Sequence, residues 1–574
     1  MGERARCAKS ARLACAALFF VALVLRLVAL PQGGPPHDYV PDEHAVRASL
    51  AMLEARDPLL RDGSPSSYPH LLPWLLAPAE AALYLFERAR GAVGSAQEFG
   101  ARLEVEPWPA FLVARAVCAL CGALTALLAV RLARRLGATA RTAWIAGALI
   151  AVSPLHVLLS AQARPWAPLG LCFLLAVERS AFALRARGRG TVGTALAAAS
   201  AAALHPLGFA AFLAWLGSAP VAARHRTRSL WIGAALATAL VFLAYPSTWG
   251  YSAKRTPAEF AEAPLVLGGQ GLYARFDGSR AGELLLELAS MEPALLLALA
   301  LALLDGARRG AANLPRRARG PRCLSWLLAL FLGAFFLLYF GTLLRYFLPA
   351  LLLIAAWSAA RLERARLWVL LALLASAVTS TRFALLLARE DTRTLAAREL
   401  ERAAPAERVA IEPGGPRLLL DQPSLARLQA IDQRSLTRRE HARLARGAAE
   451  GFSALPLERV FETRALDHFT RRYARLWSRE ARPEFSSPAE KLRLLFETES
   501  IGAVISARRA PSDGSRLLDA HLERHAELRF AIDPGTDDAR LPGEPQRGWL
   551  TIWSADRPGP RISYHSLRGG EPPR

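Results

Sequence analysis

Cysteine is missing from the last third of this sequence. The chain has 574 residues and six cysteines, and none of the six lies in residues 391–574. Disulfides therefore do not hold that region together. Lysine is also scarce, so nearly all of the positive charge comes from arginine. In a chain this rich in alanine and leucine, the arginine content indicates a compositional bias and carries little functional meaning by itself.

A nucleic-acid-binding charge pattern is absent as well. The net charge is +22, but residues 391–574 carry 31 Lys/Arg and 27 Asp/Glu, a net of only +4. The remaining +18 lies in residues 1–390, among long hydrophobic runs. Because 53% of the chain is hydrophobic and 21% is charged, we divide it into a membrane part and a soluble part.

Residues 391–574 also lack a phosphate loop, a nucleophile elbow and a cluster of metal-ligating residues. What they contain is a series of short strand-like runs that alternate with Arg/Glu-rich helical stretches such as residues 464–481. This pattern predicts a small α/β domain. The strand-like runs are residues 408–412, 417–421, 502–508, 528–532 and 548–553.

The rest of the chain predicts about eleven membrane-spanning helices, since a span needs roughly 20 apolar residues. Residues 191–204 and 207–223 are short and divided by His205-Pro206, and we interpret them as a tight hairpin. The predicted spans are residues 13–30, 109–130, 142–159, 167–184, 191–204, 207–223, 229–245, 283–304, 323–341, 346–360 and 367–388.

The distribution of arginine predicts the orientation of these spans. If the N-terminal residues 1–12 are cytoplasmic, the cytoplasmic loops hold 24 Lys/Arg and 4 Asp/Glu, and the opposite loops hold 12 and 17. This split agrees with the positive-inside rule. We therefore expect a multi-pass protein of the cell (inner) membrane, with residues 13–390 as its membrane domain. The first loop, residues 31–108, and the α/β domain, residues 391–574, are expected outside the cytoplasm.

Two alternatives affect this topology. Residues 71–87 are apolar but short, and they contain two prolines and Glu80. Their insertion would reverse all later loops, so we expect a helix that lies in the membrane interface. Residues 13–30 could instead be a cleaved signal peptide, but the apolar run is long for one and no A-x-A cleavage site follows.

Several short motifs occur in a characteristic order. They are "YVPDEHAVRASLAML", "YPHLLPWLL", "LLSAQARPWAPLGLCFLL", "LHPLGF" and "LRYFLPALLLIAAW". In this order, over about residues 13–390, the chain resembles polyprenyl-phosphate-dependent glycosyltransferases of the C superfamily (GT-C). The most similar branch contains bacterial relatives of protein O-mannosyltransferases and of the lipid A aminoarabinose transferase. The tail resembles the small extracytoplasmic α/β domain of some bacterial members, with "GPRISYHSL" as its closing strand.

The resemblance implies a cell-envelope enzyme that moves a sugar from a polyprenyl-phosphate-linked donor to a lipid, glycan or protein acceptor. Transfer would occur on the outer face, with inversion at the anomeric carbon. By the same resemblance, Asp42 is the expected catalytic base, and Glu43 a structural or metal-linked partner in the catalytic pair. The alternative is that both acids only cap the following helix, where negative charge is favourable.

A leaving phosphate favours arginine, whose planar fork binds oxygen atoms in pairs. Arg164 and Arg345 are the expected phosphate ligands, because both fall at outer-face ends of predicted spans, although Arg345 could simply extend to lipid headgroups. Arg115 is a third candidate. It lies inside a span, so we expect it to face the protein interior and pair with an acid such as Glu104, Glu106 or Asp42.

A divalent metal is a possible cofactor, because some members of the family hold one with a first-loop glutamate and a histidine. The candidate ligands here are Glu43, His70 and His205. The aminoarabinose branch has a Glu-Lys pair where this chain has Ser67-Tyr68. That difference puts the metal in doubt and argues against the same substrate.

Aromatic residues at the expected membrane surface could line the sugar site or form an interfacial belt. The predicted lining residues are Tyr68, His70, Trp166, His205 and Tyr346. Two other functions compete with a glycosyltransferase. A transporter or flippase would more often show internal repeats and charges in mid-span. An O-antigen ligase or polymerase would place its large loop late in the chain, whereas here it comes first.

Overall fold

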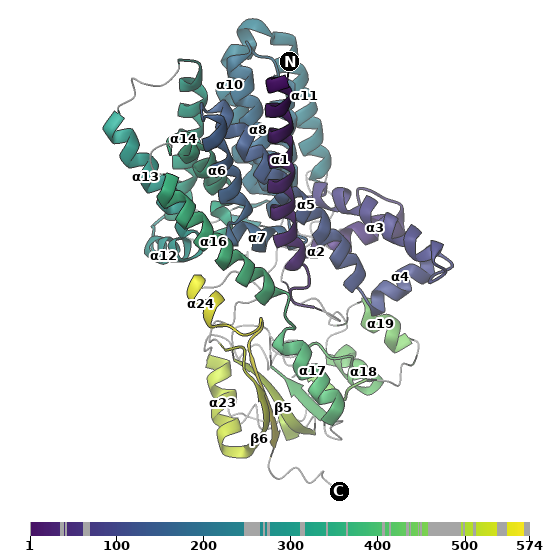
Figure 1. Ribbon diagram of the computed structural model, residues 1–574. Helices are drawn as coiled ribbons and strands as arrows, with labels where there is room; N and C mark the ends of the chain where they lie inside the picture. The colour runs from purple at the N-terminus through teal and green to yellow at the C-terminus, as the bar shows by residue number, and fades with distance from the viewer. Residues whose placement is uncertain are drawn as a thin grey trace.

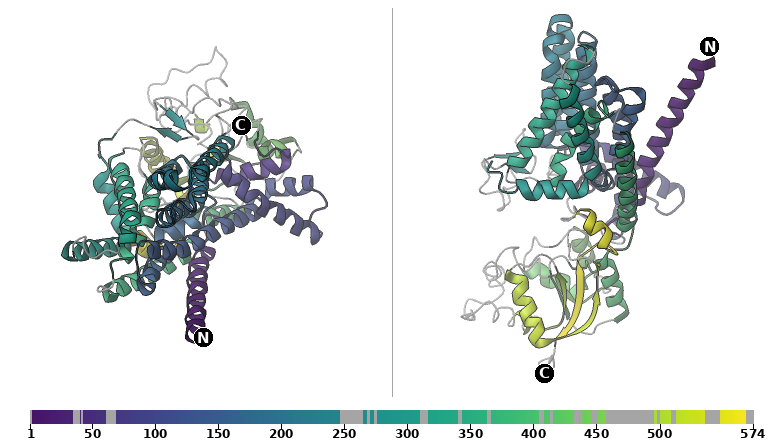
Figure 2. Two further views of the ribbon diagram at one scale, coloured as in Figure 1. Left: turned by 90° about the horizontal axis from the view of Figure 1, so that it is seen from above. Right: turned by 60° about the vertical axis from the view of Figure 1, so that its left-hand side comes forward.

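The computed structural model shows a long helical bundle with a smaller α/β unit at one end (Figures 1 and 2). The N-terminus lies at the far end of the bundle from this unit (Figure 1). The structure describes residues 2–34, 40, 43–60, 69–245, 265–267, 270–272, 276–309, 316–339, 343–362, 366–403, 408–412, 415–431, 436, 438–445, 447, 451–456, 495–497, 500–508, 513–535 and 548–567.

Helices dominate the first 390 residues. Those of the N-terminal half are α1 (Gly2–Val28), α2 (His44–Ala55), α3 (Leu71–Ala89), α4 (Ala96–Val105), α5 (Trp108–Arg135), α6 (Ala140–Ala151), α7 (Pro154–Ser160), α8 (Trp166–Arg185), α9 (Thr191–Leu204), the 3-10 helix η1 (Pro206–Ala211), α10 (Phe212–His225) and α11 (Thr227–Ala244). After two short strands, β1 (Leu265–Leu267) and β2 (Gln270–Leu272), follow α12 (Ala281–Met291), α13 (Pro293–Arg309), α14 (Arg316–Leu338), η4 (Leu344–Phe347), α15 (Leu348–Ala359) and α16 (Arg366–Leu387).

Small residues bring the central helices of the bundle close together. Helix α5 packs against α1, α6 and α8. At Gly147 of α6, a Cβ atom would lie 2.6 Å from side-chain atoms of both Leu18 and Val130. Such spacing is below van der Waals contact, so any larger residue there would push α1 and α5 away from α6. The close approach creates the rigid frame on which the loops at the helix ends are held.

The described residues contain six helices that are long and apolar enough to cross a membrane, or up to eight if each of two bent pairs is one span. The chain is therefore mostly helical and a multi-pass membrane protein. Helices α9 and η4–α15 are apolar but shorter. The predicted number of about eleven spans is not reached by this criterion and stays a prediction, as does the direction in which the chain crosses the membrane.

Two predicted straight spans are broken. The segment predicted as residues 283–304 consists of α12 and α13, which meet at an angle of 101°, and the segment predicted as 142–159 bends by 59° between α6 and α7. Pro293 lacks the N–H that would continue helix α12. The buried Glu292 carboxylate instead accepts hydrogen bonds from Ser153 Oγ, at 2.5 Å, and from the Leu155 backbone N–H, at 3.0 Å. The Glu292 carboxylate thus joins the bend between α12 and α13 to the bend between α6 and α7.

The long first loop contains three helices, α2, α3 and α4, which extend sideways from the bundle (Figure 1). Helix α3 covers the segment expected to lie in the membrane interface, and it is not among the helices that qualify as spans within the described residues. Its Leu85 and Phe86 side chains are more than half exposed. An interfacial position for α3 stays a prediction.

The C-terminal residues form a five-stranded sheet with helices packed on it. Strand order is β4-β3-β5-β7-β6; β3 pairs in parallel with β4 and β5, and β7 pairs antiparallel with β5 and β6. Leucine, isoleucine, valine and alanine side chains of the central strands form its core. The elements are α17 (Thr392–Ala403), β3 (Arg408–Ile411), α18 (Gln422–Ile431), α19 (Arg438–Ala445), β4 (Ala454–Pro456), β5 (Ile501–Arg508), α23 (Asp513–His525), β6 (Ala526–Ile532), α24 (Trp549–Ser554) and β7 (Arg561–Leu567).

One predicted strand is a helix. Residues 548–553 were expected as a strand but form α24, in which Thr551 and Ile552 are buried and Trp549, Leu550 and Trp553 are exposed. Burial of neighbouring residues is a helical pattern, whereas a strand would bury alternate ones. The run at 417–421 is also no strand, since only Leu420 makes an isolated bridge. Residues 464–481 lie outside the described residues.

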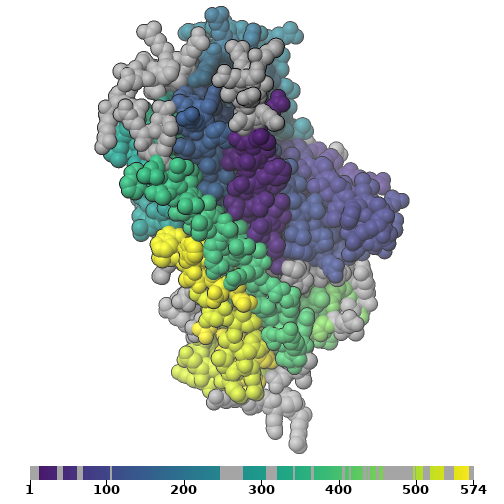
Figure 3. Space-filling view, in the orientation of Figure 1, coloured from purple at the N-terminus to yellow at the C-terminus, as the bar shows by residue number. Residues whose placement is uncertain are grey.

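Hydrogen bonds join the α/β unit to the bundle where α16 leaves it. Arg382 Nη2 donates to the Ala555 carbonyl oxygen at 2.6 Å, and Arg389 donates to the Asp556 carbonyl oxygen. Just after α16, Thr392 Oγ1 donates to the Pro560 carbonyl oxygen at 2.6 Å. The space-filling view shows the same junction as continuous contact between the green helix and the yellow C-terminal segment (Figure 3).

Candidate active site

Glu43 and Arg115 form a buried ion pair at the base of the first loop. Arg115 Nη2 lies 2.6 Å from Glu43 Oε2, Nε lies 3.0 Å from Oε1, and neither side chain is exposed. Arg115 Nη1 also donates to the carbonyl oxygens of Leu30, at 2.8 Å, and Gln32, at 2.7 Å. Arg115 thus faces the interior and pairs with an acid, as expected. Among the described residues, the acid it contacts is Glu43 and not the expected Glu104 or Glu106, and Asp42 lies outside them. A phosphate at this guanidinium would compete with the Glu43 carboxylate.

The same carboxylate holds the loop between α7 and α8. The backbone N–H of Ala163 donates to Glu43 Oε1. Gln32 Nε2 donates to the carbonyl oxygen of Ala161 at 2.8 Å, and Cys118 Sγ lies 3.7 Å from the carbonyl oxygen of Arg164. Pro165 at the start of α8 ends the loop, because its fixed φ suits the first turn of a helix. Side chains from the end of α1, the start of α2 and α5 therefore set the position of Arg164, which is 2% exposed.

Arg345, Trp166, His205 and Tyr346 form a second cluster beside this loop. The Trp166 ring centroid lies 4.8 Å from that of His205 and 5.5 Å from that of Tyr346. The Arg345 guanidinium carbon lies 5.6 Å from the Trp166 ring centroid, a cation–π distance. Since Trp166 is 1% exposed, Arg345 points into the protein and not toward lipid. Three separate helix starts, those of α8, η1 and η4, supply these residues.

His205 connects the two arginines. Burial, with the charges of Arg345 and Arg164, lowers the pKa of His205 to about 3, so its ring is neutral at physiological pH. The Leu207 backbone N–H donates to His205 Nδ1 at 3.1 Å. The proton of the neutral ring therefore lies on Nε2, which makes that nitrogen a hydrogen-bond donor.

The indole N–H of Trp166 adds another donor to the cluster. Trp166 Nε1 is buried and has no hydrogen-bond partner among the described residues. A buried N–H without a partner costs free energy, so such a group in a native site commonly awaits a ligand or a water molecule. The cluster thus presents the Arg345 guanidinium and two ring N–H donors among tilted aromatic rings, and the charge of Arg164 acts on the same histidine. This set of groups suits a ligand that combines a phosphate with a sugar.

Of the other predicted site residues, the structure describes His70, which lies apart from this cluster. Asp42 and Tyr68 lie outside the described residues. His70 is 2% exposed and packs beside Trp74, with ring centroids 6.4 Å apart. Its backbone N–H donates to the Ala244 carbonyl oxygen at 2.9 Å, which ties the first loop to the end of α11.

The candidate metal ligands are separated in the same way. Glu43 pairs with Arg115, His205 lies in the aromatic cluster and His70 packs beside Trp74. Within the described part of the chain, no three His, Cys, Asp or Glu side chains come together as a metal site. A metal requirement stays a question for experiment.

Sequence reasoning missed a buried polar group next to the site. Arg26 of α1 is fully buried, donates to the carbonyl oxygens of Ile150, at 3.1 Å, and Ala151, at 3.2 Å, and lies 2.6 Å from His156 Nδ1. It satisfies the carbonyls freed where α6 bends into α7. A charged residue within a predicted span is the signal that could have identified it. Gln32, which holds the Ala161 carbonyl oxygen, was also missed, and no feature of the sequence around it indicates that role.

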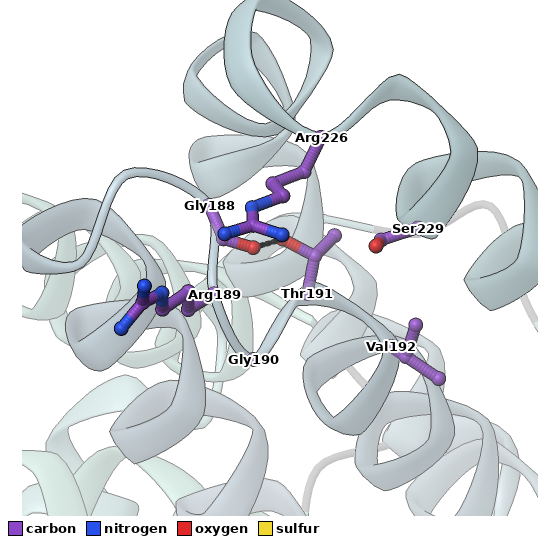
Figure 4. Close-up of a pocket in the computed structure, with 7 residues that line it drawn as sticks. All are labelled: Gly188, Arg189, Gly190, Thr191, Val192, Arg226 and Ser229. Atoms are coloured by element: carbon purple, nitrogen blue, oxygen red, sulfur yellow. Dashed lines mark hydrogen bonds between the residues drawn. The ribbon is translucent and has the colours of Figure 1, made fainter.

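A small cavity elsewhere in the bundle contains none of the predicted residues. It has a volume of about 230 Å³ and lies where α8 connects to α9 and α10 connects to α11 (Figure 4). Thr191 Oγ1 donates to the Gly188 carbonyl oxygen there, at 2.7 Å. Helix α8, with 20 residues, is about 30 Å long and separates this cavity from Trp166. The lining residues are Gly188, Arg189, Gly190, Thr191, Val192, Arg226 and Ser229.

No protein-family model and no curated protein match this sequence. Among solved structures, the chain is similar to ArnT from Cupriavidus metallidurans in the apo state, with 17% identity, a TM-score of 0.41, and coverage of 68% of this chain and 72% of ArnT. It is similar to the same protein bound to undecaprenyl phosphate, with 14% identity, a TM-score of 0.42, and coverage of 97% and 99%. A third is the arabinofuranosyltransferase AftD from Mycobacteria, with 17% identity, a TM-score of 0.41, and coverage of 96% of this chain and 40% of AftD.

Identities of 14–17% and TM-scores of 0.41–0.42 do not establish a shared substrate or mechanism. The function of this chain is therefore inferred from its own residues.

Proposed function

We propose that the protein is an integral-membrane glycosyltransferase that moves a sugar from a polyprenyl-phosphate donor to an acceptor on the extracytoplasmic face. The observation that carries this proposal is that Arg345 packs on Trp166 beside His205, and that the charges of both Arg345 and Arg164 act on the His205 ring. Two arginines that come from distant parts of the chain and act on one neutral, aromatic-lined position form a typical site for a phosphate ester.

The arrangement supports a specific division of labour. Arg164 and Arg345 would bind the donor phosphate and stabilise the negative charge that grows on it as the sugar leaves, as preorganised cations do in enzyme sites. The Trp166 and Tyr346 rings would contact the sugar face, and the Nε2–H of His205 would donate to a sugar or phosphate oxygen. The apolar helix surfaces on either side would accommodate the polyprenyl chain.

The chemical step would use Asp42 as the base, a role that comes from the sequence resemblance. An acceptor hydroxyl oxygen would attack the anomeric carbon while the bond from that carbon to the phosphate oxygen breaks. The hydroxyl proton would pass to Asp42, and the polyprenyl phosphate would leave bound to the two arginines. Attack from the face opposite the leaving phosphate inverts the anomeric centre.

Glu43 and Arg115 take a different part in this proposal. Both are engaged with each other and with backbone groups, so we assign them to hold the loop that carries Arg164 and not to contact the donor. Asp42 is one peptide bond from Glu43, and the buried pair therefore also anchors the segment that carries the base. The topology that accompanies the proposal has about eleven spans, a cytoplasmic N-terminus and an extracytoplasmic α/β domain in residues 391–574.

Donor-dependent transfer in membranes tests the proposal. Membranes that contain the protein would be supplied with a series of undecaprenyl-phosphate sugars, each radiolabelled in the sugar, and transfer to envelope acceptors would be measured. The expected result is transfer by the wild type that is lost in Arg345→Ala and strongly reduced in Arg345→Lys, because lysine is a point charge and not a fork.

Arg280→Ala, which removes one partner of the half-exposed Arg280–Glu283 pair, is the matched control and should keep full activity. Equal activity in Arg345→Ala and wild type would overturn the assignment.

A further inference from the structure

Two arginines lie against a single tryptophan at the C-terminal end of helix α15. The cluster around Arg345 lies at the other end of this helix. The Arg361 guanidinium carbon is 5.1 Å from the Trp357 ring centroid and that of Arg322 is 5.8 Å from it. Trp326 stacks on the same ring, with centroids 4.3 Å apart and planes 19° from parallel. Three elements meet here, because Arg322 and Trp326 belong to α14, Trp357 belongs to α15, and Arg361 follows α15.

This cluster is remote from the candidate active site. Helix α15 begins directly after Tyr346 and Phe347 and has 12 residues, a length of about 18 Å. Trp357 lies near its other end. A ligand at Trp357 would therefore be distinct from a ligand at Arg345.

Among the described residues, no carboxylate forms an ion pair with Arg322 or Arg361. Arg322 is 4% exposed, and its Nε and Nη2 atoms are buried without a hydrogen-bond partner among the described residues, as is Nε of Arg361. The charge of Asp305 acts on Arg322 without forming an ion pair with it. The buried Arg322 and the half-buried Arg361 carry like charges that repel each other, and buried guanidinium nitrogens without partners are costly.

Other arginines of this chain show the contrast, whether exposed, half-buried or buried. Arg131 and Arg135 lie 3.4 Å and 3.3 Å from the buried carboxylate of Glu178. Arg115 is paired with Glu43, and Arg393 with Asp391. Among the described residues, the buried Arg115 and Arg393 thus each have a carboxylate partner, whereas the buried Arg26 is held by carbonyl oxygens and His156. At Trp357 the described residues place neither kind of partner on the buried Arg322 nitrogens.

We infer that Arg322, Arg361 and Trp357 form a binding site for a phosphate group at the end of helix α15 away from the candidate active site. The guanidinium fork matches phosphate oxygens, and the indole faces hold the guanidinium groups in place. Basic pockets between membrane helices bind anionic lipid headgroups on the cytoplasmic side. A phosphate monoester free in solution has the same chemistry, so the experiment must distinguish a lipid from a soluble source.

Native mass spectrometry of the full-length protein in detergent tests this site. Wild type, Arg322→Gln, Arg361→Gln and Arg131→Gln would be titrated with dioleoyl-phosphatidylglycerol and, in parallel, with dioleoyl-phosphatidylcholine. We expect wild type to retain phosphatidylglycerol in preference to phosphatidylcholine. Each of the first two substitutions should weaken phosphatidylglycerol binding by about tenfold, the change expected when a charge-assisted contact worth about 1.4 kcal/mol is lost.

Arg131→Gln is the matched control, because it removes an arginine that already has Glu178 as its partner. It should leave lipid retention unchanged. Arg361 is only half-buried, so its variant provides a test even if Arg322→Gln fails to fold. Equal retention in wild type and both site variants, or an equal loss in Arg131→Gln, would overturn the proposal.

Inorganic phosphate added to the phosphatidylglycerol complex identifies the source of the ligand. Displacement of the lipid at millimolar phosphate would assign the site to a soluble phosphate compound. Retention of the lipid, together with the loss in the two site variants, would assign it to an anionic phospholipid.

Discussion

Arg115 and Glu43, 72 positions apart in the sequence, form a two-point ion pair in which neither side chain is exposed to solvent. The carboxylate also accepts the backbone N–H of Ala163. One buried pair thus joins helix α5, the start of α2 and the loop that carries Arg164. A substitution of either residue should therefore lower the free energy of unfolding and change the position of Arg164 in the candidate site.

Glu43→Gln should destabilise the protein by about 3–5 kcal/mol, because it leaves the buried Arg115 charge without its counter-ion. Unfolding of the purified protein in detergent, followed by circular dichroism, measures the change. Glu283→Gln removes one partner of the half-exposed Arg280–Glu283 pair and should cost no more than about 1 kcal/mol. If the two variants unfold alike, Glu43 does not anchor the loop.

Trp166→Phe should weaken binding of the donor lipid by about fivefold to tenfold while the protein stays folded. Phenylalanine keeps an aromatic face but removes the buried N–H, which is worth about 1 kcal/mol as a hydrogen-bond donor. Equilibrium binding of a fluorescent undecaprenyl phosphate measures the effect. Trp215→Phe is the matched control, since Trp215 of α10 also has a buried indole N–H without a described partner. A loss of affinity in the control alone would contradict the role given to Trp166.

The helical, multi-pass character of the membrane part could be predicted, because the length of apolar runs can be read directly from the sequence. The inward direction of Arg115 follows from the cost of a charge within a span, and the structure confirms it. The identity of its partner did not follow, because the expected acids were Glu104, Glu106 and Asp42, whereas the described partner is Glu43. Only the packing of α2 on α5 brings Glu43 to Arg115. Sequence likewise could not show that Glu292 bends two helices, since its contacts with Ser153 and Leu155 span more than 130 residues.

The misjudged element in the α/β unit has a different cause. Residues 548–553 contain tryptophan, isoleucine and threonine, which have high β propensity. Tertiary contacts override that preference, because α24 packs on the end of α16, where a short helix can bury Ile552. A six-residue apolar run is too short for its periodicity to distinguish a helix from a strand.

His70 should make the first loop sensitive to acid. Burial lowers the pKa of His70 to about 4, against an ordinary value of 6.5, and the nearby charge of Asp57 acts in the opposite direction. Because the folded-state pKa lies below the unfolded value, the stability that this group contributes is complete above pH 6.5 and is lost as the pH falls toward 4. The loss is at most about 3 kcal/mol, at roughly 1.36 kcal/mol per pKa unit.

Thermal unfolding of wild type and His70→Gln between pH 7 and pH 4 measures this contribution. The difference in stability between the two proteins should shrink as the pH falls, because glutamine has no proton to take up. A constant difference across this range would show that His70 does not titrate as its burial implies.

The proposed topology predicts which parts of the chain are accessible from outside the cell. In a cysteine-free background, a cysteine at the exposed position Ala520 of α23 should react with an impermeant maleimide in intact cells or spheroplasts. A cysteine at the exposed position Arg189, between α8 and α9, should react only after the membrane is permeabilised. The reverse pattern would place the candidate site on the cytoplasmic face and would contradict the proposed reaction.

The most direct measurement is a density map of the protein with bound undecaprenyl phosphate. The account predicts that the phosphate lies between Arg164 and Arg345, with its oxygen atoms about 2.7–2.9 Å from guanidinium nitrogens, beside Trp166 and His205, and with the Asp42 carboxylate facing the position of the sugar. A phosphate bound elsewhere would contradict the proposed function. In that result Arg345 would still pack on Trp166 but would not contact the phosphate.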